Sequence, residues 1–262
     1  MKMNLSKLLI YILLCIFTQK NIFSQRQITY IDGFSINTRV GVASVTGELG
    51  DFFTLKPTFN LSVEKGISEK VNLLIDFNTG NLEGSESAPY YSRFNCEFFQ
   101  VNFISNLHLI RLLDENNLNA HYSIKPYLGL GLIWFHTDVY DMNTGFFLRT
   151  TADGTTKHTS LFQQSGSGVG SKGIYYTREL AIPFGFISEF RLNKRFSTLV
   201  DLRYSWIYND KLDATTEYNL KVPNKIGGIN SYSNTANDGW MSLSIGIKYK
   251  FMSMKIMKQR GV

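Results

Sequence analysis

Cysteine is scarce in this sequence, which has two cysteines, Cys15 and Cys96, in 262 residues. Cys15 lies in an apolar N-terminal segment that we expect to be cleaved off, so only Cys96 would remain in the mature chain. A single cysteine cannot form an internal disulfide, even in a compartment that permits one. Disulfides are therefore excluded as the source of stability.

Long hydrophobic runs are also missing. The apolar run at residues 8–17 covers about ten residues, roughly half of what a helix needs to cross a bilayer. It follows Lys2 and Lys7, and Ser24 offers a small residue at a plausible cleavage site. This pattern is typical of a secretory signal peptide, which we predict at residues 1–24.

Two other interpretations of the leader are weaker. A retained membrane anchor would need a longer apolar run. A lipoprotein is disfavoured because Cys15 follows two leucines rather than small residues. Elsewhere no stretch approaches the ~18 apolar residues of a spanning helix, so a membrane location would have to be reached through strands.

A strong charge of either sign is absent as well. The formal net charge is +6, and loss of Lys2, Lys7 and Lys20 with the leader would reduce it to +3. The remaining basic residues are scattered rather than clustered, which argues against nucleic acid as a partner. No change of composition marks a linker, so we expect one domain at residues 25–251.

Alternation of apolar and polar residues is the main positive signal, and it is clearest at residues 53–64. Every second residue there is apolar, which is the period of a strand with one wet face. The apolar members are Phe53, Leu55, Pro57, Phe59, Leu61 and Val63. The pattern alone does not decide whether the apolar face meets lipid or a soluble core, so a soluble sandwich or lipocalin-like barrel stays open.

Eight segments carry this pattern with varying clarity. They are residues 34–45, 53–64, 71–80, 94–109, 124–136, 180–192, 196–208 and 240–251. Between them we expect a polar connection at 81–92 and long loops at 137–177 and 209–239, the first with a hairpin inside. Gly129 and Gly131 share one face, as the interior of a narrow barrel requires. The prediction is an all-β, eight-stranded antiparallel up-and-down transmembrane β-barrel.

Charged residues on the face opposite the apolar one are predicted to fill the lumen. They form an expected structural charge network of Arg39, Asp76, Glu189, Arg191, Asp201 and Arg203, with Lys56 on the same face. Inward charges of both signs satisfy each other when buried. The alternative is the selectivity lining of a small pore, although side chains usually plug a barrel of eight strands.

The last predicted strand resembles the signal by which outer-membrane barrels are recognised for assembly. Its elements are a polar residue, a glycine and two spaced aromatics, here Ser244, Gly246, Tyr249 and Phe251. The strand does not end the chain, because residues 252–262 follow. We expect these to form a short basic tail in the periplasm.

Three stretches extend the resemblance to a family. Residues 125–131 (KPYLGLG), 183–186 (PFGF) and 238–251 resemble small outer-membrane β-barrels of the OmpA-like, porin-family type. The resemblance implies the outer membrane of a Gram-negative bacterium, with the barrel-assembly machinery and outer-membrane lipid as partners. Residues 208–213 (YNDKLD) are similar to the PorG-type barrel of the type IX secretion system, whose members are implied to anchor a periplasmic ring.

Histidines raise two site hypotheses. His136, Asp138 and Ser160 lie in or near the longest loop, and a lipid enzyme would use such groups for acyl transfer. Their order and spacing match no motif, so we expect no catalysis. His108 and His121 are too far apart for a compact metal motif, so we expect neither metal nor cofactor.

Aromatic residues near the expected outer strand ends, Trp134, Tyr204, Trp206 and Tyr208, predict an interfacial girdle. The sequence therefore predicts a non-enzymatic barrel that serves as a structural or accessory subunit of an envelope assembly, with other envelope or secretion proteins as partners. The alternatives are a small passive pore and a lipid-modifying enzyme.

Overall fold

The computed structural model describes residues 29–30, 33–47, 49–50, 53–68, 70–87, 91–113, 121–151, 175–208, 211–215, 221–223, 229–231, 237–251 and 255–256. The chain divides into a barrel unit, Tyr30–Met254, and a second unit made of Met1–Thr29 and Lys255–Val262. The predicted signal peptide, most of the predicted basic tail and Ser160 lie outside the residues that the structure describes.

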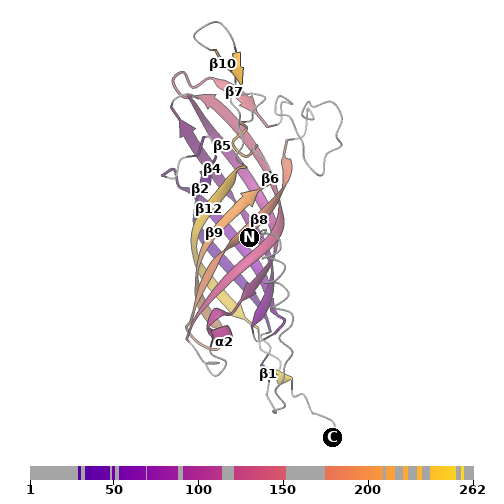
Figure 1. Cartoon of the computed structure of the whole chain (residues 1–262). Helices are drawn as coiled ribbons and strands as arrows, with labels where there is room; N and C mark the ends of the chain where they lie inside the picture. Colours follow the sequence, from indigo (N-terminus) through magenta and orange to yellow (C-terminus); the bar gives the residue numbers. More distant parts are fainter. Residues whose placement is uncertain are drawn as a thin grey trace, which may run out of the picture. The chain divides into compact units, whose positions relative to one another are not determined.

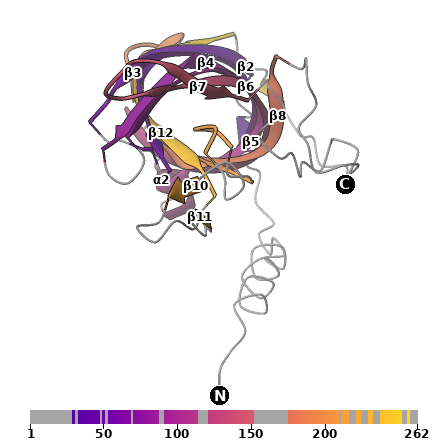
Figure 2. The ribbon, with the colours of Figure 1, turned by 90° about the horizontal axis from the view of Figure 1, so that it is seen from above.

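Eight antiparallel strands form the barrel (Figure 1). They are β2 (Phe34–Thr46), β3 (Lys56–Gly66), β4 (Val71–Glu86), β5 (Ser92–Leu107), β6 (Tyr122–Asp141), β8 (Thr177–Arg191), β9 (Phe196–Ile207) and β12 (Gly239–Lys250). Neighbours in the sheet follow the order β5-β4-β3-β2-β12-β9-β8-β6, and pairing of β5 with β6 closes the ring seen in Figure 2. The prediction of a closed eight-stranded antiparallel barrel is confirmed.

The remaining elements are short. Strand β7 (Phe147–Thr150) pairs with the far end of β6, and β10 (Lys221–Pro223) pairs with β11 (Ile229–Ser231). Strands β1 (Thr29–Tyr30) and β13 (Lys255–Ile256) form a separate two-stranded sheet, and α2 (Leu109–Leu113) follows β5. No helix in the described part of the chain is long and apolar enough to cross a membrane.

The barrel has two rims, which we name by their connections. The turn rim carries the short turns after β3 and β8, together with α2. The loop rim, at the top of Figure 1, carries the connections after β2, β4, β6 and β9.

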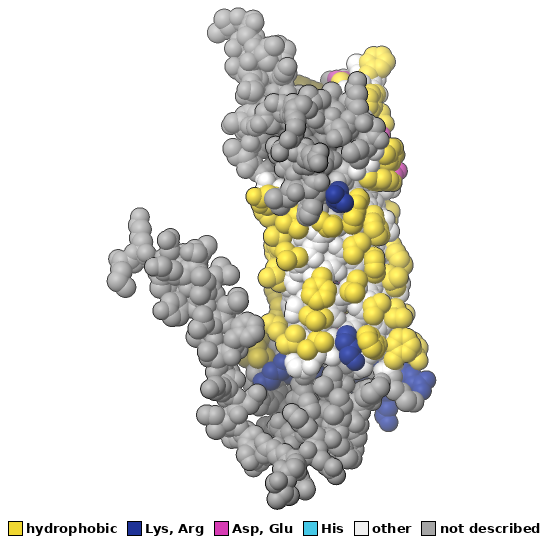
Figure 3. Space-filling model, turned by 90° about the vertical axis from the view of Figure 1, so that its right-hand side faces the viewer, with side chains coloured by type: hydrophobic (Ala, Val, Ile, Leu, Met, Phe, Trp, Pro, Cys, Tyr) yellow, Lys and Arg dark blue, Asp and Glu magenta, His cyan; other side chains and the backbone are white. Residues whose placement is uncertain are grey.

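The side chains point as the alternation predicts. Phe59 and Phe184 face outward with 43% and 45% of their surface exposed, whereas Asp76 and Arg203 face inward with 0% and 1%. All eight barrel strands expose large apolar side chains on the outer face, which together form a belt, and Figure 3 shows one side of it. A belt of this size would be unstable in water, because soluble monomers rarely expose apolar patches above a few hundred Å². The soluble-barrel alternative is therefore wrong, and the barrel spans a membrane.

Several predicted boundaries are wrong. Residues 81–86, predicted as part of a polar connection, continue β4 and pair with residues 92–97 of β5. In this extension, the side chains of Leu82 and Phe94 point inward and are buried in the apolar core. Strand β6 likewise extends to Asp141, where β7 replaces β8 as its neighbour, so the expected hairpin inside the long loop is present. Strand β3 begins at Lys56, three residues after the predicted start at Phe53.

Candidate functional site

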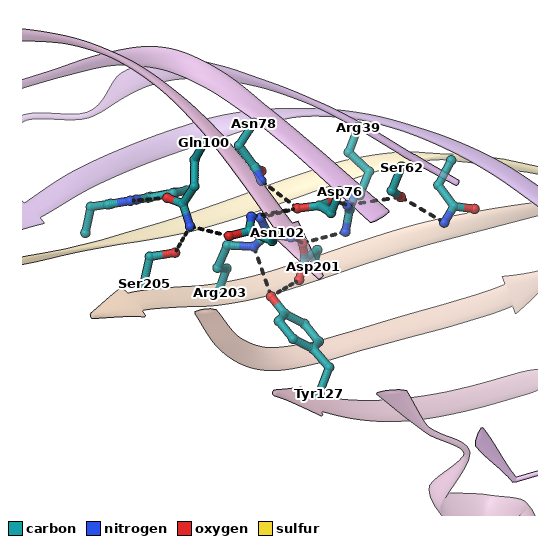
Figure 4. A network of polar contacts seen from close by, with 12 residues as sticks. Arg39, Ser62, Asp76, Asn78, Gln100, Asn102, Tyr127, Asp201, Arg203 and Ser205 are labelled. Atoms are coloured by element: carbon teal, nitrogen blue, oxygen red, sulfur yellow. Dashed lines mark hydrogen bonds and ion pairs between the residues drawn. The ribbon is translucent and has the colours of Figure 1, made fainter. Parts of the chain in front are cut away.

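Four of the predicted network residues meet at the centre of the lumen (Figure 4). The two guanidinium groups of Arg39 and Arg203 alternate with the carboxylates of Asp76 and Asp201. Arg39 reaches Asp76 at 2.5 Å and Asp201 at 2.6 Å, and Arg203 reaches them at 2.7 and 3.3 Å. All four are buried, and the charges of two arginines and two aspartates cancel. We call these four residues the central layer.

Neighbouring polar groups complete the central layer. Tyr127 donates its hydroxyl to Asp201 at 2.9 Å and accepts the Arg203 Nε–H at 3.1 Å. The amides of Asn78 and Asn102 donate to Asp76 at 2.5 and 3.3 Å. Buried charges are tolerated when their lone pairs and protons are used in this way.

Glu189 belongs to a second cluster nearer the turn rim, the lower layer. Its carboxylate meets Lys125 at 2.5 Å, Lys248 at 3.3 Å and Lys250 at 2.6 Å. Glu64 accepts from Lys248 at 2.7 Å in the same cluster. Arg191, at the end of β8, is half-buried and takes part in neither layer.

Sequence reasoning did not include Glu64, Lys125, Tyr127 and Lys248 in the network. Each lies on the inward face of its strand, an even number of residues from one that the sequence analysis had placed on that face. Lys125 and Tyr127 share their face with Gly129, and Lys248 shares its face with Gly246. The alternation therefore carried the signal for all four residues, although it could not show which inward residues lie at the same height.

The lumen is not polar throughout, which corrects the expectation of uniformly wet inward faces. A thin apolar layer of Leu74, Ile104, Ile187 and Leu199 lies with Tyr127 between the two charged layers. Toward the loop rim the inward residues become an apolar core. Its members are Ala43, Val45, Leu49, Leu82, Phe94, Cys96, Phe98, Ile133, Phe135, Val139, Ala181, Ile207, Leu212, Ala214 and Trp240.

Residues 211–215 fold into this core from the connection after β9, and we call them the plug. Leu212 is fully buried, and its carbonyl accepts the Thr137 hydroxyl at 2.7 Å. Asp213 accepts the Leu49 amide at 3.0 Å, and Lys211 meets Glu179 at 3.1 Å. Among the described residues, buried side chains therefore occupy the lumen at each level from the lower layer to the plug.

The four residues of the predicted assembly signal divide between the two faces of β12. Ser244 and Gly246 face the lumen, whereas Tyr249 and Phe251 face outward. A Cβ at Gly246 would lie 2.5 Å from Cγ of Arg39, its partner on β2. This glycine thus gives Arg39 room to reach the central layer.

The predicted girdle residues Trp134, Tyr204, Trp206 and Tyr208 face outward toward the loop rim, and the rings of Trp206 and Tyr208 lie 5.6 Å apart. A second aromatic group lies at the turn rim, where Phe196 and Phe251 flank Tyr249 at 5.2 and 5.1 Å. Aromatic bands at both edges of an apolar belt mark the two membrane interfaces.

His136 and Asp138 lie together on the outer face, with 3.3 Å between Nε2 and Oδ1. The other ring nitrogen, Nδ1, faces the Tyr175 carbonyl at 3.0 Å. Both ring nitrogens of His136 are therefore engaged with neighbouring oxygen atoms.

The other two histidines that the structure describes occupy separate places. His108 is buried beside Asn72, with Nε2 2.9 Å from the amide, and His121 is exposed. Within the described ranges, no group of three or more histidine, cysteine, aspartate or glutamate side chains could hold a metal ion.

Comparison with known proteins finds only distant likenesses. No family model and no curated protein matches the chain. Neisserial surface protein A is 14% identical, with 84% of this chain and 97% of that chain covered and a TM-score of 0.43. The attachment invasion locus protein Ail of Yersinia pestis is also 14% identical, with 84% and 100% covered and a TM-score of 0.42.

The chain has the architecture of small outer-membrane β-barrels. This statement rests on the closed antiparallel barrel, the outward apolar belt and the two aromatic bands, which together are the features of that class. An outer-membrane location follows from the same features.

Proposed function

We propose that this barrel is a non-conducting, non-enzymatic subunit of an envelope assembly that binds another protein at its loop rim. The filled lumen is the observation that carries the proposal. Two ion-paired layers, an apolar layer between them and the plug occupy the space that a solute would need. A passive pore is therefore the weaker alternative.

The hairpin of β6 and β7 offers the surface for a partner. Its tip exposes Met142, Phe146, Phe147 and Leu148, and Phe146 is 72% exposed. The tip is fixed, because Asp141 accepts the Asn143 and Thr144 amides at 2.9 and 2.7 Å and Gly145 adopts a positive φ of 73°. Exposed apolar groups on a fixed hairpin are typical of protein interfaces.

Type IX secretion is the finer proposal, and it rests on the similarity of residues 208–213 to the PorG-type barrel. Within that segment, Lys211, Leu212 and Asp213 belong to the plug. Their burial accounts for these residues without a secretion partner, so the assignment needs its own test.

Site-specific photo-crosslinking in intact envelopes tests the partner. A crosslinker at Phe146 should give one defined adduct, and Phe147→Ser should abolish it. A crosslinker at Leu113, exposed in α2, is the matched control and should not give that adduct. If the Phe146 adduct contains a type IX component, the finer proposal holds. If Phe146 gives no protein adduct, the scaffold role is wrong.

Planar-bilayer recording tests the filled lumen separately. The purified chain should show no stepwise conductance. Regular single-channel steps from the folded protein would replace the scaffold proposal with the pore.

A further inference from the structure

A groove of about 770 Å³ lies on the outer surface of the barrel over β3 to β6. Phe59, Thr79, Phe99 and Trp134 line it, and all four project outward from the sheet. It therefore opens toward the membrane and is separate from the lumen and from the β6–β7 hairpin tip.

Strand register explains why the surface is hollow here. Phe59 pairs with Thr79, Thr79 with Phe99, and Phe99 with Trp134, so the four form one row across four strands. Thr79 is the single small member, between two phenylalanines. Its hydroxyl donates to the Phe98 carbonyl at 3.0 Å, so it presents no unsatisfied donor to lipid. The gap above Thr79 lies between two phenylalanine side chains and has a mainly apolar lining.

The next outward row toward the loop rim is polar. Asn81 pairs with Glu97, and Glu97 pairs with His136. Asn81 and Glu97 line the same groove, whose wall is completed by Tyr176. The groove thus crosses from the apolar belt to the polar rim, which is the profile of an amphiphile rather than of a wholly apolar ligand.

The polar end of the groove is negative. Glu97 is the carboxylate that lines this end. Outside the lining, Asp138 of β6 supplies a second carboxylate, which is engaged with His136, and the His136 ring is stacked on Tyr175 at 3.8 Å. Desolvation and, after it, the charge of Glu97 raise the pKa of Tyr175. Arg178, the partner of Trp134 on β8, lies on the side of Trp134 away from the groove.

We propose that this groove binds one phospholipid with a primary-amine headgroup. One acyl chain lies over Thr79 between Phe59 and Phe99, and the ammonium group donates to Glu97. Three N–H donors match a carboxylate beside an amide, and the aromatic walls contact the chain. A phosphate-only headgroup would instead meet the like charges of Glu97 and Asp138.

Native mass spectrometry of the full chain tests the proposal with three phospholipids of identical acyl chains, bearing ethanolamine, choline or glycerol headgroups. The ethanolamine lipid should be retained as one copy, roughly tenfold more than the choline lipid, the ratio for one charge-assisted hydrogen bond. Thr79→Phe should remove retention, whereas Thr38→Phe, at an outward threonine of β2 away from the groove, should not. Glu97→Gln should remove the headgroup preference, whereas Glu86→Gln at the rim should keep it.

Other outcomes overturn the proposal. Equal retention of all three lipids, or retention by Thr79→Phe, would show ordinary annular lipid. Preference for the glycerol lipid would show an anion site instead. If Thr79→Phe does not fold, quenching of Trp134 fluorescence by brominated acyl chains is measured instead. The Trp134 fluorescence is the difference between the wild type and Trp134→Phe. The ethanolamine lipid should quench it more than the choline lipid does. Equal quenching would contradict the assignment.

Discussion

At the scale of single residues, the inward charged side chains have stricter requirements for their neighbours than the outward apolar side chains do. Each carboxylate of the central layer meets two guanidinium groups, so removal of one leaves a buried cation without compensation. This is the costly case for an ion pair, whereas an exposed pair contributes little.

Asp76→Ala tests the central layer. We expect the free energy of unfolding to fall by about 3–5 kcal/mol, because Arg39 and Arg203 lose a shared partner. Urea unfolding in detergent micelles, followed by tryptophan fluorescence, measures the change. Glu83→Gln is the control: it removes only the half-exposed pair with Lys56 and should cost less than about 1 kcal/mol. Equal effects of the two substitutions would show that burial does not govern these pairs.

The assembly-signal residues are predicted to separate by face. Tyr249→Ala and Phe251→Ala remove outward rings and should leave folding in micelles nearly intact while reducing insertion in cells. Gly246→Ala should reduce stability in micelles by about 1–3 kcal/mol, since its new Cβ meets the Arg39 stem. Refolding yields beside membrane fractionation measure the two effects. If the aromatic variants insert normally, the recognition role is wrong.

At the scale of elements, the plug converts the connection after β9 into part of the core. Its backbone polar groups are satisfied by neighbours, such as the Leu212 amide that donates to Asp238 at 2.6 Å. The segment is therefore packed like a core element rather than like a loop.

Leu212→Ala should lower the free energy of unfolding by about 2–5 kcal/mol, the range for a buried leucine. Leu113→Ala, at an exposed site in α2, should change it by less than about 0.5 kcal/mol. Denaturant titration gives both values. A small effect at Leu212 would mean that the plug leaves the lumen in solution.

The hairpin tip should depend on acid. Hydrogen bonds from the Thr144 amide and hydroxyl lower the pKa of Asp141 below its ordinary value of 3.8. A lowered pKa means that the stabilisation is fully present above pH 3.8 and is lost as the pH falls through the lowered value. The protection of the Thr144 amide against hydrogen exchange, relative to its intrinsic rate at each pH, should therefore stay constant down to pH 3.8 and fall as the pH drops through the lowered pKa. In Asp141→Asn, exchange should show no such step.

At the scale of the whole molecule, Cys96 reports closure of the barrel. Its side chain is fully buried in the loop-rim core. With Cys15 replaced by serine, a maleimide reagent should leave the folded barrel unlabelled and label it completely in urea. Labelling without denaturant would show that the loop-rim core opens.

Much of the fold was predictable because side chains alternate between the two faces of a strand. The polar face of each strand then indicates which side chains point into the lumen. Arg39, Asp76, Asp201 and Arg203 were assigned to the lumen on this ground alone. Their grouping was not predictable, because Glu189 lies at another height on its strand and only the stagger between strands fixes height.

Two further features were beyond the pattern. Leu82 and Phe94 are apolar yet face inward, so alternation of polarity fades at the loop rim and the strand ends there were missed. The plug has no periodicity at all, and its burial depends on contacts with Leu49, in the connection after β2, and with Thr137 of β6, both distant in sequence.

The strict alternation along each strand has a consequence for how this protein can diverge. Residues that face the bilayer need only be oily, so many substitutions among leucine, isoleucine, valine and phenylalanine leave the exterior equivalent. Half of every strand is thus nearly free to drift while the interior holds its stacked layers. Common ancestry in such a protein is therefore preserved mainly at the inward positions. These are every second residue of a strand, so comparison of continuous segments of sequence detects little of it.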